Sequence, residues 1–526
     1  MKKIWIMVLL AVGMIACTER NTPTETSGSG DSSGDTGIND EPVDEQNWSD
    51  TIKIVWSGAS ATVSGANDSI SITNANGYVT VNSSVTNTCV VYLLSGSGQG
   101  QLTIYGSYRH NITLNGLTLT CSDGPAINNQ CHKKCYLVIN GTNTLTDGSS
   151  YASTTEDRKA ALFSEGQIIA SGAGSLTVKG NYKHAIASDD YILFTEELTA
   201  TLNLTASSDG LHANDGIYIN GGTTTINAGN DGVQCDSIIV INDGTIIVAS
   251  AEDKGIVDSL GITINGGTIR VTSEYKCIKT KGNLEINGGD IQVICTGAAS
   301  SGGGGGPWGG GSSSSSSPEA IEAKGTITIN GGIVYAQSAD DAINSGSTMT
   351  INDGYVMAYS TSNDGLDANN NLYIKGGLVY AIGAGGAENG VDAKEGCTLY
   401  VQGGTLVSLG DLERGASLTQ TCYYNSSWTA STWYSITVGD KTFAFKTPTK
   451  SSSSGGHGGG PGGGGSNSTP LVVSGASQPT VKSGVTVSDG TSIFNAMGYY
   501  PATVSGGSSV SLSTYSNNSG GGGGWW

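Results

Sequence analysis

The sequence has few charged residues and lacks a second long hydrophobic run. Only 13% of its 526 residues are charged, whereas 81 are glycine. No stretch after the N-terminal segment approaches the ~20 apolar residues of a transmembrane helix, so we expect a soluble body. The chain also lacks an EF-hand loop, a P-loop ending in Gly-Lys-Ser/Thr and a metalloprotease motif. These absences argue against an EF-hand calcium sensor, a P-loop nucleotide-binding protein and a metalloprotease.

Positive charge is scarcer than negative charge. The chain has 24 Lys and Arg residues against 44 Asp and Glu residues, which gives a net charge of −20 at pH 7. An acidic chain repels the phosphates of nucleic acids but attracts metal cations. We therefore expect no nucleic-acid partner and consider cation binding instead.

The N-terminus resembles a bacterial lipoprotein signal peptide over residues 1–17. Lys2 and Lys3 precede a short apolar run, and Met14-Ile15-Ala16-Cys17 reads as a lipobox, so we expect cleavage before a lipid-modified Cys17. Residues 18–50 are mainly Ser, Thr, Gly, Asp and Glu, the composition of a disordered stalk. We expect a monomeric protein of the cell envelope, held at the surface or periplasmic face of the outer membrane by its lipid alone.

An internal repeat is the strongest signal in the chain. Glycine-containing corner triplets recur every 22 or 23 residues, apart from one gap of 43 and one of 27. Asn and Gly tolerate the left-handed backbone of a tight corner, and stacked Asn amides can bond to one another along the repeat axis. The triplets begin at Asn220, Asn242, Asn265, Asn287, Asn330, Asn352, Lys375 and Gln402.

Three short runs of alternating hydrophobic residues separate successive corners. Alternation with many β-branched residues indicates strands, and the same inward pattern recurs in phase, which an antiparallel sandwich would not produce. Such strands stack in parallel on their equivalents, ~4.8 Å apart. We therefore predict an all-β fold: a right-handed parallel β-helix with three sheets and about 22 residues per coil. It spans residues 55–425, followed by a C-terminal β region (426–518) with a Gly/Ser-rich loop and a Gly-rich tail (519–526).

Acidic residues recur in the turn before the first strand of each coil and on the outward face of that strand. Asp-Gly is a common turn, so a single Asp can simply form the turn. Carboxylates in register on adjacent coils repel one another, however, and a divalent cation removes that repulsion. Their hard oxygen atoms suit Ca²⁺. The predicted Ca²⁺ ligands form two clusters, Asp209, Asp231, Asp236 and Asp253, and Asp340, Asp341, Asp364, Asp367 and Asp392.

The polar face of the first strand also carries candidate contacts to a glycan. The Gly- and Ser-rich insertion at residues 297–317 leaves the helix beside this face, and its Trp308 can stack on a sugar ring. The alternative for the insertion is a solvated low-complexity loop. The predicted glycan contacts are Trp308, Glu322, Lys324, Asp367 and Asp392.

The chain resembles bacterial calcium-binding parallel β-helix proteins of a carbohydrate-binding family, whose fold is similar to that of pectate lyases. The resemblance covers residues 55–470. It rests on Asp-Gly-Leu-x-Ala at residues 209–213 and 364–368, on Ala-Ile-Glu-Ala-Lys at 320–324, on the Asn-Gly-Gly repeats, and on the glycine-rich insertions with Trp308. It implies binding of an acidic or cellulosic plant cell-wall polysaccharide together with Ca²⁺.

Three functions remain open. A non-catalytic binder would use Ca²⁺ to bridge Asp and uronate carboxylates. In a pectate-type lyase, Ca²⁺ would acidify the proton beside the uronate carboxylate, and Lys279, Lys281 or Lys324 would remove it. The third function is that of a surface adhesin without a defined ligand. Glu322 is expected beside Lys279, which keeps a lysine protonated, and no Arg lies on that strand to clamp a carboxylate. These features favour the binder.

Overall fold

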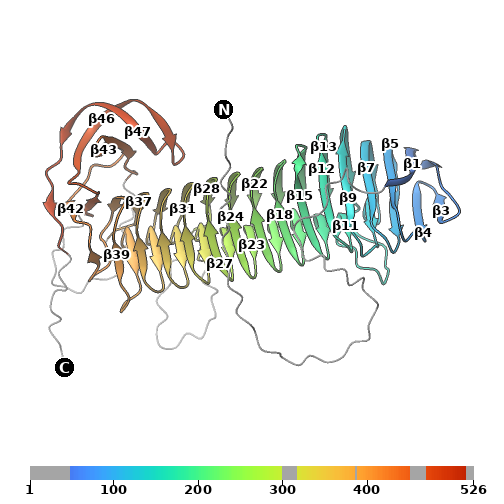
Figure 1. Ribbon diagram of the computed structural model, residues 1–526, viewed down its shortest axis with the longest axis horizontal. Helices are drawn as coiled ribbons and strands as arrows, with labels where there is room; N and C mark the ends of the chain where they lie inside the picture. Colours follow the sequence, from blue (N-terminus) through green and yellow to red (C-terminus); the bar gives the residue numbers. More distant parts are fainter. Residues whose placement is uncertain (1–47, 299–316, 386–387, 450–468, 517–526) are drawn as a thin grey trace, which may run out of the picture. The chain divides into compact units, whose positions relative to one another are not determined.

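A computed structural model of the chain describes residues 48–298, 317–385, 388–449 and 469–516. Within these ranges all regular structure is β, and parallel strands stack into a β-solenoid of about 14 turns with about 23 residues per turn (Figure 1). The predicted all-β parallel solenoid is therefore confirmed. None of the described segments forms an apolar helix of membrane-spanning length.

The first strand of each coil contributes to a separate sheet of 14 strands, which we call the first-strand sheet. Apart from the antiparallel pair at its start, its neighbouring strands are parallel and in register. Its strands are β3(Ile70–Ala75), β4(Tyr78–Ser83), β6(Gln101–Tyr105), β8(Ile127–Asn129), β11(Ala160–Ser164), β14(His184–Ser188), β17(Leu211–Ala213), β20(Val233–Cys235), β23(Lys254–Asp258), β26(Lys276–Thr280), β29(Ile321–Ala323), β32(Ile343–Ser345), β35(Leu366–Ala368) and β38(Val391–Ala393).

The second and third strands of the coils form the other two faces. The second-strand ladder contains β1(Trp48–Gly58), β5(Cys89–Gln99), β7(His110–Thr120), β9(Cys135–Asn140), β12(Ile168–Gly172), β15(Tyr191–Leu198), β18(Gly216–Ile219), β21(Ile238–Ile241), β24(Gly261–Ile264), β27(Asn283–Ile286), β30(Ile327–Ile329), β33(Met349–Ile351), β36(Leu372–Ile374), β39(Leu399–Val401) and β41(Ser417–Leu418). The third contains β10(Thr142–Thr146), β13(Ser175–Gly180), β16(Thr201–Ala206), β19(Thr223–Ala228), β22(Thr245–Ala251), β25(Thr268–Ser273), β28(Asp290–Cys295), β31(Ile333–Ser338), β34(Tyr355–Ser360), β37(Leu378–Ile382) and β40(Thr405–Leu409).

The corner between the second and third strands carries a continuous ladder of asparagine amides. Asn242 donates from Nδ2 to Oδ1 of Asn220 over 2.7 Å, and Asn265 donates to Asn242 over 2.7 Å. The same bond repeats as far as Asn352. The last glycine of each corner has a positive φ, for example 80° at Gly222, a conformation that residues with a Cβ rarely adopt. The corner triplets therefore set the period of the solenoid, and their stacking is as predicted.

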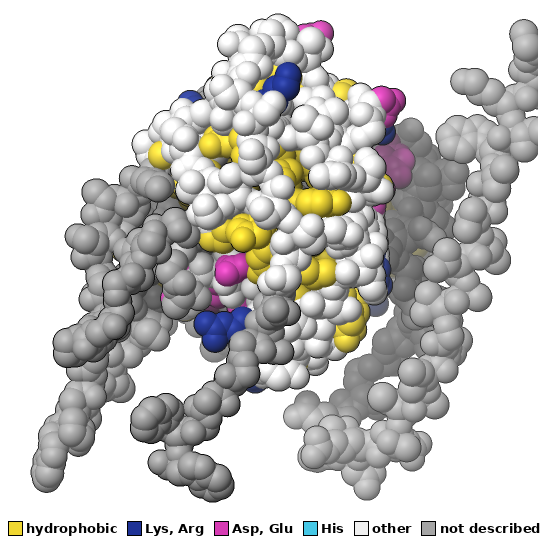
Figure 2. All heavy atoms as spheres, turned by 90° about the vertical axis from the view of Figure 1, so that its left-hand side faces the viewer, with side chains coloured by type: hydrophobic (Ala, Val, Ile, Leu, Met, Phe, Trp, Pro, Cys, Tyr) yellow, Lys and Arg dark blue, Asp and Glu magenta, His cyan; other side chains and the backbone are white. Residues whose placement is uncertain are grey.

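The C-terminal region packs a small barrel against the outer face of the third strands. The barrel closes from β43(Trp433–Val438), β44(Lys441–Lys446), β46(Thr480–Ile493) and β47(Gly498–Ser509). Tyr380 of β37 is fully buried against Phe443 and Phe445 of the barrel, and its hydroxyl donates to the Lys446 carbonyl over 3.0 Å. Figure 2 views this end of the molecule and shows hydrophobic side chains gathered across its middle. The barrel explains why the outward positions of the late third strands are apolar.

Four further strands complete the two ends of the solenoid. The short strand β2(Ser60–Ser64) pairs antiparallel with β1 at the start. At the other end, β45(Leu471–Ser474) runs antiparallel to both β40 and β42(Cys422–Asn425), and β48(Ser513–Thr514) pairs with β42. Antiparallel strands thus close both ends of the parallel stack.

Candidate functional site

Two neighbouring columns of polar and charged side chains run along the first-strand sheet. The turn column lies two residues before the first inward residue of the strand, and the strand column lies one residue after it. The strand register places equivalent residues of successive coils directly over one another. The turn column contains His184, Asp209, Asp231, Lys254, Lys276, Glu319, Asp341, Asp364 and Asn389, and the strand column contains His212, Gln234, Val257, Lys279, Glu322, Asn344, Asp367 and Asp392.

Histidines surround the first acidic residue of the columns. Oδ2 of Asp209 lies 3.1 Å from Nδ1 of His184 and 3.0 Å from Nδ1 of His212. Burial alone raises the pKa of Asp209, but the hydrogen bonds to the two histidines outweigh burial and hold this pKa well below its usual value. Our sequence reasoning overlooked His184. Aligning the inward residue Ile186 with Leu211 would have found it, because this register places His184 and Asp209 in the same turn column.

Lys254 neutralises part of the negative charge of the other residues in the first predicted cluster. Burial raises the pKa of Asp231 to about 6, although Lys254 Nζ lies 3.6 Å away and opposes this rise. Lys254 also bonds to Asp253, and Asp236 accepts a 2.7 Å hydrogen bond from Gln234. The structure thus stacks Asp231 next to Asp209, whereas Asp253 is paired with a lysine and Asp236 with an amide.

A hollow of about 210 Å³ opens on the first-strand sheet beside these residues. Acidic and basic side chains line its walls, and Lys281 donates to Ser259 Oγ over 3.3 Å. The charged residues around it are Asp231, Asp236, Lys254, Asp258, Lys279 and Lys281.

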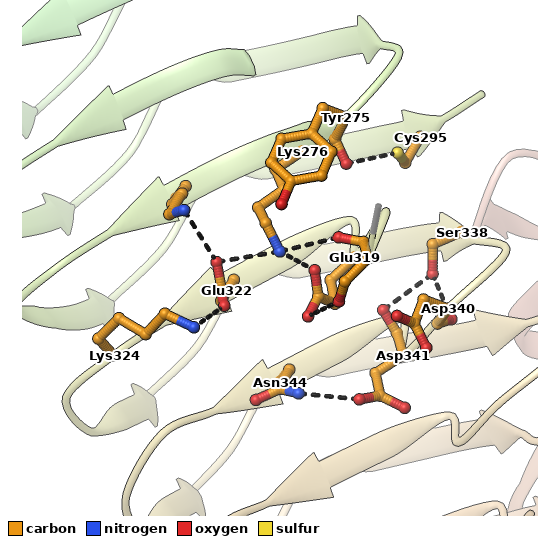
Figure 3. A network of polar contacts seen from close by, with 12 residues as sticks. Tyr275, Lys276, Cys295, Glu319, Glu322, Lys324, Ser338, Asp340, Asp341 and Asn344 are labelled. Atoms are coloured by element: carbon orange, nitrogen blue, oxygen red, sulfur yellow. Dashed lines mark hydrogen bonds and ion pairs between the residues drawn. The ribbon is translucent and has the colours of Figure 1, made fainter. Parts of the chain in front are cut away.

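A lysine and glutamate network occupies the middle of the columns (Figure 3). Glu322 is 2% exposed, and its carboxylate lies 3.1 Å from Lys276 Nζ and 3.5 Å from Lys279 Nζ. Lys324 bonds to the same carboxylate, and Lys276 also bonds to Glu319. Burial alone raises the pKa of Glu322, but the bond from Lys324 and the charges of Lys276 and Lys279 lower it. The Glu322 carboxylate therefore faces lysines instead of solvent.

The lysines of this network differ in their exposure to solvent. The Lys324 side chain is 58% exposed and can reach a ligand, whereas Lys276 is buried. Sequence reasoning missed Lys276 and Glu319, because across the insertion it aligned the outward strand residues Lys279 and Glu322 and not the turn residues that the same register brings together.

The second predicted cluster lies on three adjacent coils, where Glu388, which was not predicted, adds a further carboxylate. We call these residues the acid row: Asp340, Asp341, Asp364, Asp367, Glu388 and Asp392. The backbone N–H of Asp364 donates to Asp341 Oδ1 over 3.2 Å, and Asp367 lies in register with Asp392. Amide groups supply further bonds. Asn344 Nδ2 donates to Asp341 over 2.8 Å and to Asp367 over 3.3 Å, and Asn389 Nδ2 donates to Asp392 over 2.6 Å.

In the described part of the chain, no positive charge pairs with the acid row. Among the ion pairs of the described residues, none involves any of its six carboxylates. Burial, assisted by repulsion between neighbouring carboxylates, raises the pKa of Asp341 to about 6, of Asp367 to about 7 and of Asp364 to about 8. Carboxylate and amide oxygens are the donors that a hard divalent cation prefers. These donor types suit Ca²⁺, but among the described residues no three acid-row carboxylates bring one oxygen each within 4.8 Å of one another.

Two predicted functional residues fall outside the described residues. These are Trp308 in the insertion and Cys17 at the expected lipidation site, so their predicted roles stay predictions.

A solved structure described as a polysaccharide lyase-like protein from C. thermocellum, as a gadolinium derivative, is 21% identical to the chain with a TM-score of 0.33, and the match covers 47% of this chain and 95% of that one. No curated protein matches the chain significantly. A family model described as carbohydrate-binding domain-containing protein matches residues 75–365, which is more than half of the sequence. The chain therefore belongs to this family of carbohydrate-binding domain-containing proteins.

Proposed function

We propose that the protein binds an acidic or cellulosic plant-type polysaccharide without cleaving it, and that Ca²⁺ held by the acid row mediates this binding. The observation that carries the proposal is the acid row itself. Six carboxylates from adjacent coils lie together, three of them with strongly raised pKa values, and no ion pair of the described residues neutralises them.

Electrostatic energy explains why a cation belongs there. Two ionised carboxylates one coil apart, at ~4.8 Å, repel each other by roughly 3 kcal/mol at an effective dielectric constant near 20. A divalent cation replaces this repulsion by attraction. Asp341, Asp364, Asp367 and Asp392 would hold the ion, and Asn344 offers an amide oxygen. When bound, Ca²⁺ supplies an attractive point for carboxylate or hydroxyl oxygens, because it accepts six to eight oxygen ligands and few protein sites supply all of them.

The path of the glycan follows the first-strand sheet. Coils rise by ~4.8 Å, which is close to the length of one sugar residue in an extended glycan, so consecutive sugars meet consecutive coils. Lys279 and Lys281 border the hollow of about 210 Å³ and can pair with uronate carboxylates. The exposed Lys324 lies between this hollow and the acid row. These lysines add positive charge to the same sheet, two or more coils away from Asp367 and Asp392, the predicted glycan contacts in the acid row.

The pairing of the lysines supports a binder over a lyase. A lysine that removes a proton needs a free amine, but Lys279 and Lys324 both contact the carboxylate of Glu322. Incubation with polygalacturonate and Ca²⁺ should therefore give no ultraviolet absorbance from unsaturated products. A steady rise in that absorbance that disappears in Lys279→Ala would establish the lyase.

A sedimentation assay tests the binding proposal. The protein is mixed with insoluble polygalacturonate or cellulose, with Ca²⁺ or with chelator, and the bound fraction is measured. We expect chelation and the double variant Asp364→Asn/Asp367→Asn to remove most binding. Asp353→Asn is the matched control, because Asp353 lies at an exposed corner and only accepts a bond from the backbone N–H of Gly354. Binding that is unchanged by both chelator and double variant would reject calcium dependence.

We also propose that the protein is a surface lipoprotein anchored through Cys17. The lipobox sequence and the polar segment after it support this assignment. In cells, Cys17→Ser should move the protein from the membrane fraction to the soluble fraction and abolish incorporation of a labelled fatty acid. Labelling that persists in the variant would exclude Cys17 as the anchor.

A further inference from the structure

A second cluster of ligand atoms lies at the other end of the same columns. His184, Asp209 and His212 each offer one nitrogen or oxygen atom, and these atoms lie within 4.8 Å of one another. His184 is 7% exposed and Asp209 is 3% exposed, and the two imidazole rings lie 4.2 Å apart between centroids. His184 comes from the turn column of one coil, and the other two residues come from the next coil.

The spacing of the three atoms suits a common ion. Metal bonds to imidazole nitrogen and carboxylate oxygen are about 2.1 Å long, so two ligands of a tetrahedral ion lie about 3.4 Å apart, a few tenths of an ångström more than the spacings here. Asp209 Oδ2 lies 3.1 Å from His184 Nδ1 and 3.0 Å from His212 Nδ1. The two rings are stacked, so they must turn about χ2 before both ring planes point at one ion. His212 is only partly buried, which leaves room for its ring to turn.

The other carboxylate oxygen of Asp209 is already held by the protein. Asn230 Nδ2 donates to Oδ1 over 2.8 Å, and the backbone N–H of Asp231 donates to it over 3.2 Å. Such outer bonds fix the direction of a ligating carboxylate and raise metal affinity. Oδ2 is thereby directed at the two imidazoles.

We propose that His184, Asp209 and His212 form a binding site for a divalent transition-metal ion of the Zn²⁺ type. Two nitrogen donors and one oxygen donor suit Zn²⁺, Ni²⁺ or Fe²⁺, whereas Ca²⁺ requires an all-oxygen shell. This assignment changes the expected role of Asp209, which the sequence placed in a calcium cluster. The site is separate from the acid row, because five coils, or about 24 Å at ~4.8 Å per coil, lie between Asp209 and Asp341.

The solenoid itself supplies conservative variants for the test. In the next coil Gln234 occupies the place of His212, and in the preceding coil Ala160 occupies the place of His184. The variants His212→Gln and His184→Ala therefore insert side chains that the same ladder positions already accept. His132→Gln is the control, since the His132 side chain is 78% exposed and lies elsewhere.

Titration calorimetry with Zn²⁺ in the presence of excess Ca²⁺ measures the site alone. We expect one Zn²⁺ per chain, affinity at least about 100-fold weaker in either site variant, and no change in His132→Gln. The acid-row variant Asp364→Asn/Asp367→Asn should keep full Zn²⁺ affinity, so that failure of the calcium proposal leaves this one standing. X-ray absorption of the Zn²⁺-loaded wild-type protein should count two imidazole ligands even if a variant fails to fold. Absence of Zn²⁺ binding, unchanged affinity in both site variants, or fewer than two imidazoles would overturn the proposal.

Discussion

The ion-free protein should lose stability as pH rises through the range in which the acid row ionises. In the folded state the pKa of Asp364 is about 8, that of Asp367 about 7 and that of Asp341 about 6, each raised from 3.8 chiefly by burial. The folded chain therefore binds more protons than the unfolded chain between pH 4 and pH 8. A raised pKa contributes stability that is fully present below the unfolded value and is lost as pH rises through the folded value.

The size of the loss follows from these pKa values. Each tenfold difference in proton affinity corresponds to about 1.4 kcal/mol. Between pH 5.5 and pH 8.5, ionisation of Asp364 with its pKa of about 8 removes about 3 kcal/mol of stability. Asp367 and Asp341 add to this loss, but the three carboxyls repel one another, so their contributions do not sum independently. We expect a total of about 3–6 kcal/mol, or roughly 3–6 °C in the melting temperature of a chain of this size.

Thermal melting followed by far-ultraviolet circular dichroism measures this effect. In chelator the melting temperature should fall from pH 5.5 to pH 8.5, and added Ca²⁺ should restore most of the loss at pH 8.5 but little at pH 5.5. Asp364→Asn/Asp367→Asn should flatten the pH dependence in chelator, whereas Asp353→Asn should behave as the wild type. A melting temperature in chelator that rises with pH, or the same slope in the double variant, would refute the reasoning.

Three smaller predictions concern the corner, the barrel and the glycan surface. Asn287 donates to Asn265 over 2.8 Å and accepts from Asn330 over 2.7 Å, so Asn287→Ala should cost about 1–2 kcal/mol in chemical denaturation, and no loss would deny the ladder a structural role. Tyr380→Ala removes a fully buried ring, so it should cost about 3–5 kcal/mol and speed proteolysis of the barrel; an unchanged cleavage rate would contradict the packing. Lys279→Ala should weaken polygalacturonate binding about 3–10-fold at low salt and less at high salt, where surface charges are screened, and equal binding at both would argue against contact with the glycan.

The repeat made the solenoid predictable from sequence. The spacing of the corner triplets gives the length of one coil, and the alternation of residues shows which side chains face inward. Counting one repeat therefore places Asp341 over Asp364. The acid row could be predicted for the same reason. Counting places acids on adjacent coils, and stacked strands of fixed spacing convert that count into proximity.

Counting repeats did not predict contacts that depend on the length of a side chain or on a coil of irregular length. The turn from His184 to Asp209 is longer than the usual repeat, so the His184 imidazole was not aligned with the acids. Lys276 and Glu319 meet only after the long insertion is removed from the count. The barrel leaves a visible signal in the sequence, because Tyr335 and Met357 occupy outward positions that hold Asn203 and Thr225 in earlier coils. Apolar residues at outward positions indicate that another segment covers them.

Along the two columns, some carboxylates are neutralised by neighbouring side chains, whereas others depend on protons or on a ligand for neutralisation. A parallel stack brings equivalent side chains together at every coil, so any charged position repeated in sequence becomes a row of like charges. Two histidines face Asp209, and three lysines surround Glu322. The acid row continues the same columns without such partners. Its carboxylates must therefore stay protonated, which costs stability once they ionise above neutral pH, or be neutralised by a cation from solution. Under our calcium proposal, that cation is Ca²⁺.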